Sequence, residues 1–201
     1  MAHRIRLAHD ADAAPVAAIY GPIVEQTAIS FETVAPAAEE MRRRIIETLE
    51  TYPWLVCEID GRIAGYAYAA KHRTRGAYRW SVDSTVYVDP AFRRLGVGHG
   101  LYVSLFAILA QQGYVNAYAG IALPNEASVA LHETLGFESV GIYRRVGFKH
   151  GAWHDVGWWA LALNEHVPSP AEPAPVPTVA ARPGWPAILG RGEPIVRSRA
   201  G

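Results

Sequence analysis

The stretch VYVDPAFRRLGVGHG, residues 86–100, constrains the fold of this chain more than any other segment. A β-rich run ends there, a short loop carries Gly96, Gly98 and Gly100, and a helical pattern follows at once. Glycines allow positive φ and close backbone approach, and the start of a helix offers unpaired N–H groups and a positive dipole. The segment therefore predicts a strand, an anion-binding turn and a helix in direct succession. A glycine-rich connector without a ligand is the alternative reading of such spacing.

Two better-known phosphate loops do not fit this stretch. A Walker A loop ends in Gly-Lys-Ser/Thr, whereas Gly98 is followed by His99 and Gly100. A dinucleotide fingerprint needs a small residue where Leu101 stands and an acidic residue about 20 positions further on, where Tyr118 falls. The pattern that remains is R-x-x-G-x-G, beginning at Arg93.

Strand and helix patterns alternate along the rest of the chain. Most neighbouring strands are joined as hairpins, while residues 79–121 read as strand, helix, strand, so we expect an α+β (α/β) fold with a mixed sheet and helices on its faces. Asp10, Asp12 and Asn125 are expected helix caps, and Gly113 and Gly136 are expected helix ends. The expected strands are 3–7, 54–59, 63–69, 79–88, 114–121, 137–146 and 155–163, and the expected helices start near 10, 39, 99 and 125.

Composition changes abruptly after Glu165, where most of the prolines are found. Proline lacks the N–H that regular structure needs, so we predict a folded domain over residues 1–165 and an extended, flexible tail over 166–201. The apolar tail residues Trp185, Ile188, Leu189 and Ile195 leave open that the tail docks on a partner subunit.

The charge balance and the single cysteine exclude several functions. Lys plus Arg (19) equals Asp plus Glu (19), so no broad basic field favours a nucleic acid, and no apolar run is long enough to span a membrane. Cys57 cannot form an internal disulfide, which favours a reducing compartment, and we expect it to be a small apolar strand residue and not a nucleophile. These features predict a soluble, cytoplasmic protein.

Several long motifs carry a more specific resemblance. They are YPWLVCEIDGRIAGYAYA, WSVDSTVYV, GIALPNEASVALHETLGF and GFKHGAWHDVGWW. With the R-x-x-G-x-G turn, they resemble the phosphinothricin and methionine sulfoximine N-acetyltransferases of the GNAT superfamily, in the same order over about residues 5–163. The resemblance implies the acyl-CoA N-acyltransferase fold, a mostly antiparallel twisted sheet with helices on both faces. It also implies acetyl-CoA as co-substrate, direct attack by the amine of a small amino acid, such as phosphinothricin or methionine sulfoximine or sulfone, within a ternary complex, and a homodimer.

The same resemblance implies where the coenzyme lies. The strand backbone over 86–88 would pair with the pantetheine arm and present an N–H to the thioester oxygen, and the glycine turn would hold the pyrophosphate. The implied coenzyme-binding residues are Val86, Tyr87, Val88, Arg93, Arg94, Leu95, Gly96, Val97, Gly98, His99, Asn125 and Thr134.

Two residues are the catalytic candidates. Asp83 stands just before the turn, where the resemblance implies a glutamate base; because aspartate is shorter by one methylene, a water could bridge it to the amine. His132 stands where the resemblance implies an active-site histidine, either for proton transfer or for holding the substrate. Tyr102 and Tyr143 are rival donors of a proton to the leaving thiolate.

An acceptor with carboxylate and phosphinate or sulfone groups needs fixed positive donors, which arginine supplies. The loop KHRTRGAY contributes them, and Phe31 would form an apolar wall. The expected acceptor-binding residues are Phe31, Arg73, Thr74, Arg75, Tyr78, Asp83, Ser84 and Thr85.

Three alternatives accompany this interpretation. His150, His154 and Asp155 are close in sequence, but their spacing alternates along a turn and strand, so we predict no metal. The same coenzyme could serve a protein N-terminus or a polyamine as acceptor. A catalytically silent acyl-CoA-binding module is the third possibility.

Overall fold

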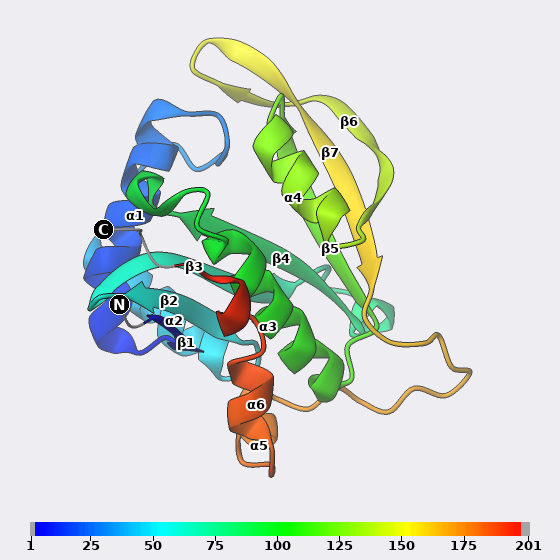
Figure 1. The fold of residues 1–201 in the computed structure, drawn as a ribbon. Coiled ribbons are helices and arrows are strands. Elements are labelled where there is room, and N and C mark those ends of the chain that lie inside the picture. Colours follow the sequence, from blue (N-terminus) through cyan, green and yellow to red (C-terminus); the bar gives the residue numbers. More distant parts are fainter. Residues whose placement is uncertain (1–2, 198–201) are drawn as a thin grey trace.

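A seven-stranded sheet forms the centre of the computed structural model, which describes residues 3–197 (Figure 1). The strand order is β1-β2-β3-β4-β5-β7-β6, and every neighbouring pair is antiparallel except β4 with β5. The strands are β1 His3–Leu7, β2 Trp54–Ile59, β3 Arg62–Lys71, β4 Ser81–Val88, β5 Asn116–Leu123, β6 Glu138–Lys149 and β7 Ala152–Ala162. The prediction of a mixed, mostly antiparallel sheet is confirmed.

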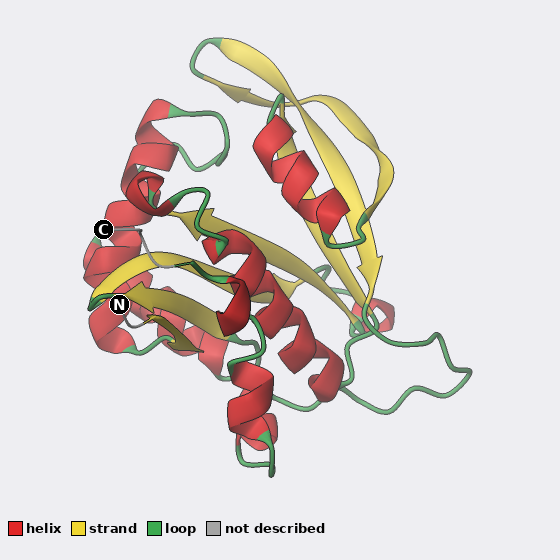
Figure 2. Ribbon diagram, viewed as in Figure 1, coloured by secondary structure: helices red, strands yellow, loops and turns green. Residues whose placement is uncertain are grey.

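Helices cover both faces of this sheet (Figures 1 and 2). Helices α1 (Ala13–Gln26) and α2 (Ala38–Leu49) enclose one hydrophobic cluster, while α3 (Val97–Gln112) and α4 (Glu126–Thr134) lie over the other face. Short 3-10 helices precede or join these elements: η1 Asp10–Asp12, η2 Gly76–Tyr78 and η3 Pro90–Phe92. None of the helices in residues 3–197 is long and apolar enough to cross a membrane.

The parallel pair β4 and β5 separates soon after it forms. Its pairing covers Ser81–Asp83 with Asn116–Tyr118, after which β4 continues toward η3 and β5 toward α4. The two strands diverge visibly in Figure 2. Their inner edges therefore have backbone groups available to a ligand between them.

Of the predicted helix caps, Asn125 is confirmed and Asp12 is wrong. Asn125 caps α4, since its Oδ1 accepts the N–H of Ser128 at 3.2 Å. Asp12 does not cap α1 with its side chain; its carboxylate accepts two hydrogen bonds from Arg6, at 2.6 and 2.8 Å, and the N–H of His9. A guanidinium held on β1 provides stronger, charge-assisted hydrogen bonds than the helix start does.

The segment after Glu165 differs from the expected extended tail. It contains α5 (Val176–Ala180), α6 (Trp185–Leu189) and η4 (Glu193–Ile195), which pack along α3, and it buries Val176, Val179 and Val196. Its prolines cannot donate backbone hydrogen bonds, but its apolar residues pack on the core of this chain, and that burial stabilises the segment. Residues 1–2 and 198–201 of the two predicted segments lie outside the described residues.

Candidate active site

The turn between η3 and α3 concentrates backbone donors. Arg94 (φ 62°) and Gly96 (φ 77°) both adopt the left-handed conformation, and α3 begins at Val97. The N–H of Gly100 donates to the carbonyl of Gly96 at 2.8 Å, so the amides just before it, at the start of the helix, have no acceptor within the helix. Such a turn fits a phosphate or pyrophosphate group.

A cleft of about 90 Å³ lies between the diverging strands β4 and β5. Gly98 lies near this cleft, because a Cβ added there would lie 3.8 Å from Cγ2 of the lining residue Val86 and 3.3 Å from Leu131 Cδ2. The lining residues are Ile29, Ser84, Thr85, Val86, Tyr87, Tyr102, Ala119, Gly120, Ile121, Ala122, Asn125, Ser128 and His132.

Two lining residues form a hydrogen-bonded pair. His132 Nδ1 lies 2.7 Å from the carbonyl of Ser128, which can only accept, so Nδ1 carries a hydrogen. Its Nε2, 3.1 Å from the Tyr102 hydroxyl, then accepts the Tyr102 O–H. Burial lowers the pKa of His132 and raises the pKa of Tyr102, so both side chains are neutral near pH 7.

Asp83 lies on the opposite face of β4 from Ser84, because side chains alternate along a strand. Its carboxylate Oδ1 is 2.6 Å from His72 Nδ1, and the two side chains are 32% and 10% exposed. Burial raises the pKa of Asp83, although the His72 hydrogen bond opposes that rise. The sequence places His72 within the loop KHRTRGAY but gives it no role, since nothing in the spacing links it to Asp83.

Trp158 of β7 contacts both His72 and Arg73. The guanidinium carbon of Arg73 lies 5.4 Å from the Trp158 ring centroid, and the His72 ring meets Trp158 edge-on. Gly120 makes room for it, because a Cβ there would lie 3.2 Å from the indole. Trp158 is not among the predicted site residues, although it lies within one of the family motifs.

The loop between α1 and α2 closes one side of this region. Phe31 is 38% exposed, and its ring lies directly against Gly147 of β6, at a spot that a Cβ would occupy. Lys149, near the tip of the same hairpin, is buried and donates from Nζ to the carbonyls of Val24 and Ser30, both at 2.6 Å. The β6–β7 hairpin and the α1–α2 loop are therefore held together.

Several other predicted site residues are exposed. Thr74 and Arg75 are exposed in the loop before η2, and Tyr78 of η2 meets His72 edge-on at 5.9 Å. Thr134 is exposed at the end of α4 and does not line the cleft in the described part of the chain. Tyr143 is 52% exposed on β6, where it packs on Trp158.

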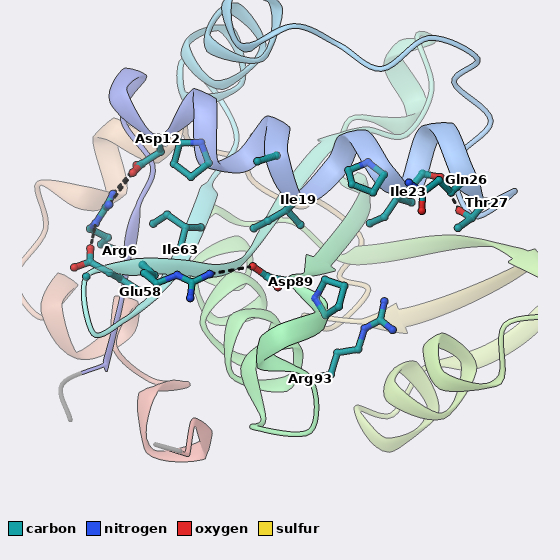
Figure 3. Close-up of a pocket in the computed structure, with 16 residues that line it drawn as sticks. Arg6, Asp12, Ile19, Ile23, Gln26, Thr27, Glu58, Ile63, Asp89 and Arg93 are labelled. Carbon is teal, nitrogen blue, oxygen red and sulfur yellow. Dashed lines mark hydrogen bonds and ion pairs between the residues drawn. The ribbon is translucent and has the colours of Figure 1, made fainter. Parts of the chain in front are cut away.

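Arg93 lines a different hollow, shown in Figure 3. This hollow of about 630 Å³ lies between α1 and the strands β2 and β3, and its charged groups are largely paired. Arg6 bonds Asp12 and Glu58 there, and Arg62 lies 4.0 Å from Asp89. Arg93, which begins the R-x-x-G-x-G pattern, thus lines this hollow and does not line the cleft between β4 and β5.

The remaining reactive side chains have structural partners. His154 Nε2 contacts the Lys149 carbonyl, and Asp155 pairs with Arg144. Within residues 3–197, no three His, Cys, Asp or Glu side chains are close enough to hold a metal ion. Cys57 is buried in β2, where burial raises its pKa to about 12 and suppresses the thiolate.

Comparison with known proteins identifies the family. The family model for the acetyltransferase (GNAT) domain matches residues 5–158. The chain is 42% identical to the phosphinothricin N-acetyltransferase of Streptomyces viridochromogenes over 169 residues, covering 84% of this chain and 91% of that protein. It is 34% identical to an L-methionine sulfoximine/L-methionine sulfone acetyltransferase of Salmonella typhimurium, covering 81% and 96%.

A solved structure agrees with these relatives. The phosphinothricin acetyltransferase of Sinorhizobium meliloti, determined in complex with acetyl-CoA, superimposes with a TM-score of 0.81 and 33% identity, covering 87% of this chain and 96% of that one. The resemblance inferred from the sequence motifs is confirmed. The chain belongs to the GNAT acetyltransferase family, and its similarity is to the phosphinothricin and methionine sulfoximine acetyltransferases within it.

Proposed function

We propose that the protein transfers the acetyl group of acetyl-CoA to the amine of a small amino acid, with phosphinothricin and methionine sulfoximine or sulfone as the first candidates. The observation that carries the proposal is the course of β4, which holds the partly buried carboxylate of Asp83 at the last residue paired with β5, then borders the opening between the two strands and leads through η3 to the glycine turn. The names of the similar proteins support this acceptor class.

The residues of the turn and cleft fit acetyl-CoA, which supplies an acetyl thioester to the reaction. The amides from Arg94 to His99 would hold its pyrophosphate. The unpaired edge of β4 over 86–88 would align the pantetheine arm and offer an N–H to the thioester oxygen, and such a donor is fixed before charge develops. Asn125 would contact the coenzyme while also capping α4.

Asp83 would act as the base. A free α-amine has a pKa near ~8, so it is largely protonated at neutral pH and must lose a proton before it attacks. The Asp83 oxygen not bound to His72 would take that proton, directly or through a water. A raised pKa suits the carboxylate for this task, because it makes Asp83 a better proton acceptor.

Tyr102 and His132 would serve the leaving thiolate. Tyr102 stays protonated because burial raises the pKa of its phenol, and it is the member of the pair with a hydroxyl proton to give. His132 Nε2 accepts the Tyr102 O–H in this structure, so the hydroxyl would turn from Nε2 toward the sulfur to give the thiolate its proton. This assignment favours Tyr102 over Tyr143, which lies exposed on the outer strand.

The acceptor's anionic groups would meet Arg73, which is held over Trp158, while Phe31 would pack against its apolar part. Direct attack within a ternary complex suits this arrangement, because the carboxylate and the opening between the diverging strands lie on adjoining parts of β4. Burial keeps the single cysteine protonated, so it is not suited to carry the acetyl group as a nucleophile. Residues 1–165 would form the catalytic domain.

A homodimer would complete the acceptor site. The outer strand β6 and the neighbouring β7 expose a row of large apolar side chains, which is typical of an interaction surface. These residues are Val140, Ile142, Tyr143, Val146, Phe148 and Trp153. Light scattering at working concentrations should give about twice the 21.9 kDa chain mass, and a monomer would contradict this part of the proposal. The reducing cytoplasm is the compartment that suits its single, buried thiol.

The substrate proposal is tested with a panel. Purified protein is incubated with acetyl-CoA and phosphinothricin, methionine sulfoximine, methionine sulfone, proteinogenic amino acids, a polyamine or an N-terminal peptide, and thiol release is followed. We expect turnover with the anionic amino-acid analogues, and Asp83→Asn should lower kcat by about 10²–10⁴-fold with acetyl-CoA binding retained. Turnover only with the polyamine or peptide, or none at all, would overturn the acceptor assignment.

A further inference from the structure

The strongest unassigned feature is the histidine that bonds the proposed base. His72 follows the last residue of β3, and its Nδ1 lies 2.6 Å from Asp83 Oδ1 on the neighbouring strand β4. The β3–β4 register pairs Ala70 with Asp83, so the chain places His72 just beyond the carboxylate. The contact is therefore set by sheet register.

Aromatic rings fix the His72 side chain from three other elements. Its imidazole stacks on Tyr118 of β5 with centroids 4.3 Å apart and planes at 15°. Trp158 of β7 and Tyr78 of η2 meet it edge-on, at 6.1 Å and 5.9 Å. With only 10% of the side chain exposed, the ring has little freedom to turn its Nδ1 away from Asp83.

We infer that His72 is a positioning residue for the acetyl transfer: it binds one oxygen of Asp83 and leaves the other oriented toward the acceptor amine. This inference rests on the proposed function of Asp83 as base. Aspartate has a short side chain whose two oxygens exchange by rotation, so a fixed donor on one oxygen defines which lone pair meets the amine.

One proton moves in the step that His72 supports. The N–H bond of the acceptor's ammonium breaks, the proton moves to the free Asp83 oxygen, and the nitrogen keeps the electron pair with which it attacks the acetyl carbon. The Nδ1–H of His72 stays on its nitrogen throughout. Its hydrogen bond to Asp83 is stronger when the carboxyl is ionised than when it is protonated. His72 therefore lowers the cost of holding Asp83 ionised at a partly buried position.

Other charged or titratable side chains surround Asp83 and His72. Arg73 adjoins Asp83 electrostatically, and phenols surround the pair from β3, η2 and β5. The charged and titratable neighbours are Arg73, Tyr68, Tyr78 and Tyr118. A His72 variant retains all four of these residues, so a change in the pH profile is compared at an otherwise identical set of titratable groups.

Two variants separate the hydrogen bond from the packing. His72→Phe keeps a ring for Tyr118 to stack on but removes the donor, whereas His72→Asn can keep a donor near the Nδ1 position without an imidazole. The exposed His9, near the end of β1, is the matched control in His9→Phe and His9→Asn.

We expect His72→Phe to lower kcat by about 10- to 100-fold, with KM for acetyl-CoA within about twofold of wild type. The acid limb of kcat should move to higher pH, because the hydrogen bond that lowers the pKa of Asp83 is gone. His72→Asn should recover most of the rate. Unchanged kcat and an unmoved acid limb in His72→Phe, or no recovery in His72→Asn, would overturn the inference.

A second readout does not depend on turnover. In ¹³C NMR, the Asp83 carboxyl should titrate at higher pH in His72→Phe than in wild type, with the His9 variants unchanged. An identical Asp83 midpoint would overturn the pairing even in an active enzyme. Absent turnover in wild type, together with a shifted midpoint, would instead refute the proposed acetyl transfer and leave the pairing supported.

Discussion

For the single residue Asp83, the charge needed for catalysis conflicts with the burial of the side chain. Its carboxylate must be charged to accept a proton, yet it lies where burial raises its pKa. A partly buried charge of this kind costs stability, and the His72 hydrogen bond offsets only part of that cost. Partial burial thus makes Asp83 a stronger base and lowers the stability of the fold.

Asp83→Asn should therefore stabilise the protein at neutral pH. The folded pKa of Asp83 lies above its unfolded value, so the wild type is relatively most stable below about pH 3.9 and loses that contribution as pH rises through the folded pKa. Asparagine cannot ionise and still offers His72 an acceptor oxygen. Thermal unfolding should show the Asp83→Asn variant melting at a higher temperature than wild type at pH 7, with the gap closing toward about pH 4.

The exposed Asp10 provides the control for this comparison, since Asp10→Asn should change the melting temperature little at either pH. A lower melting temperature for Asp83→Asn at pH 7 would contradict the account. That result would mean that a charged pair with His72 stabilises the fold.

At the scale of elements, the turn before α3 depends on the segment that follows the domain. Arg197 donates its N–H to the carbonyl of Leu95 at 2.8 Å, and a Cβ on Gly96 would lie 2.4 Å from the carbonyl oxygen of Ile195. The left-handed Gly96 is thus needed both for its φ and for the space that it leaves.

Gly96→Ala should weaken acetyl-CoA binding, and Gly61→Ala is its matched control. Both glycines have φ of 77°, but nothing lies within 4 Å of a Cβ at Gly61, in the turn between β2 and β3. Each variant incurs the left-handed backbone penalty of about 1–2 kcal/mol. Chemical denaturation should show a larger loss for Gly96→Ala, and calorimetry should show weaker acetyl-CoA binding in that variant alone.

Equal stability losses in the two variants, with unchanged acetyl-CoA affinity, would mean that the contact with Ile195 has no bearing on the turn.

A second element-level link joins the β6–β7 hairpin to the α1–α2 loop. Lys149→Met keeps the length of the side chain but leaves the carbonyls of Val24 and Ser30 without their donor. We expect the free energy of unfolding to fall by about 2–4 kcal/mol, since buried hydrogen bonds to charged groups are among the stronger ones. KM for the acceptor should rise while KM for acetyl-CoA stays constant.

Lys71→Met, at an exposed lysine, controls for the general effect of losing an ammonium group. A Lys149→Met protein as stable as this control, with an unchanged acceptor KM, would show that the loop is held by other contacts.

At the scale of the whole molecule, the segment after Glu165 is a structural part of the fold. Its helices lie along α3, and Glu193 accepts the N–H of Ile5 at 2.7 Å on the edge strand β1. It therefore covers an apolar helix face and blocks a sheet edge, both of which otherwise favour aggregation.

Removal of residues 168–201 should lower the melting temperature and promote self-association. Each buried valine of the segment contributes about 1.5–3 kcal/mol on burial, and Val176, Val179 and Val196 are all lost. Thermal unfolding and light scattering of the truncated chain check this. A shortened chain with an unchanged melting temperature would show that the segment only rests on the surface.

The sequence predicted the elements with strong local signals. The strands 54–59 and 63–69, the cap at Asn125 and the helix end at Gly113 follow from short-range chemistry, so their positions could be predicted directly. Family motifs supplied the candidate base and the coenzyme turn.

Contacts between distant segments could not be predicted in this way. His72 meets Asp83 only through the β3–β4 register, and Trp158 reaches the site only because β7 lies beside β5. The proline content after Glu165 suggested an extended chain, because the stabilising partners of its valines lie on α3, far away in sequence. Such pairings depend on topology, which no local pattern encodes.

The central claim is that the opening between β4 and β5, with its glycine turn, binds acetyl-CoA. Titration of acetyl-CoA into the full chain by isothermal calorimetry tests this most directly. The account predicts saturable heat with one molecule bound per chain, weakened in Gly96→Ala and retained in Asp83→Asn. A titration without saturable heat in the wild-type protein up to millimolar acetyl-CoA would contradict it.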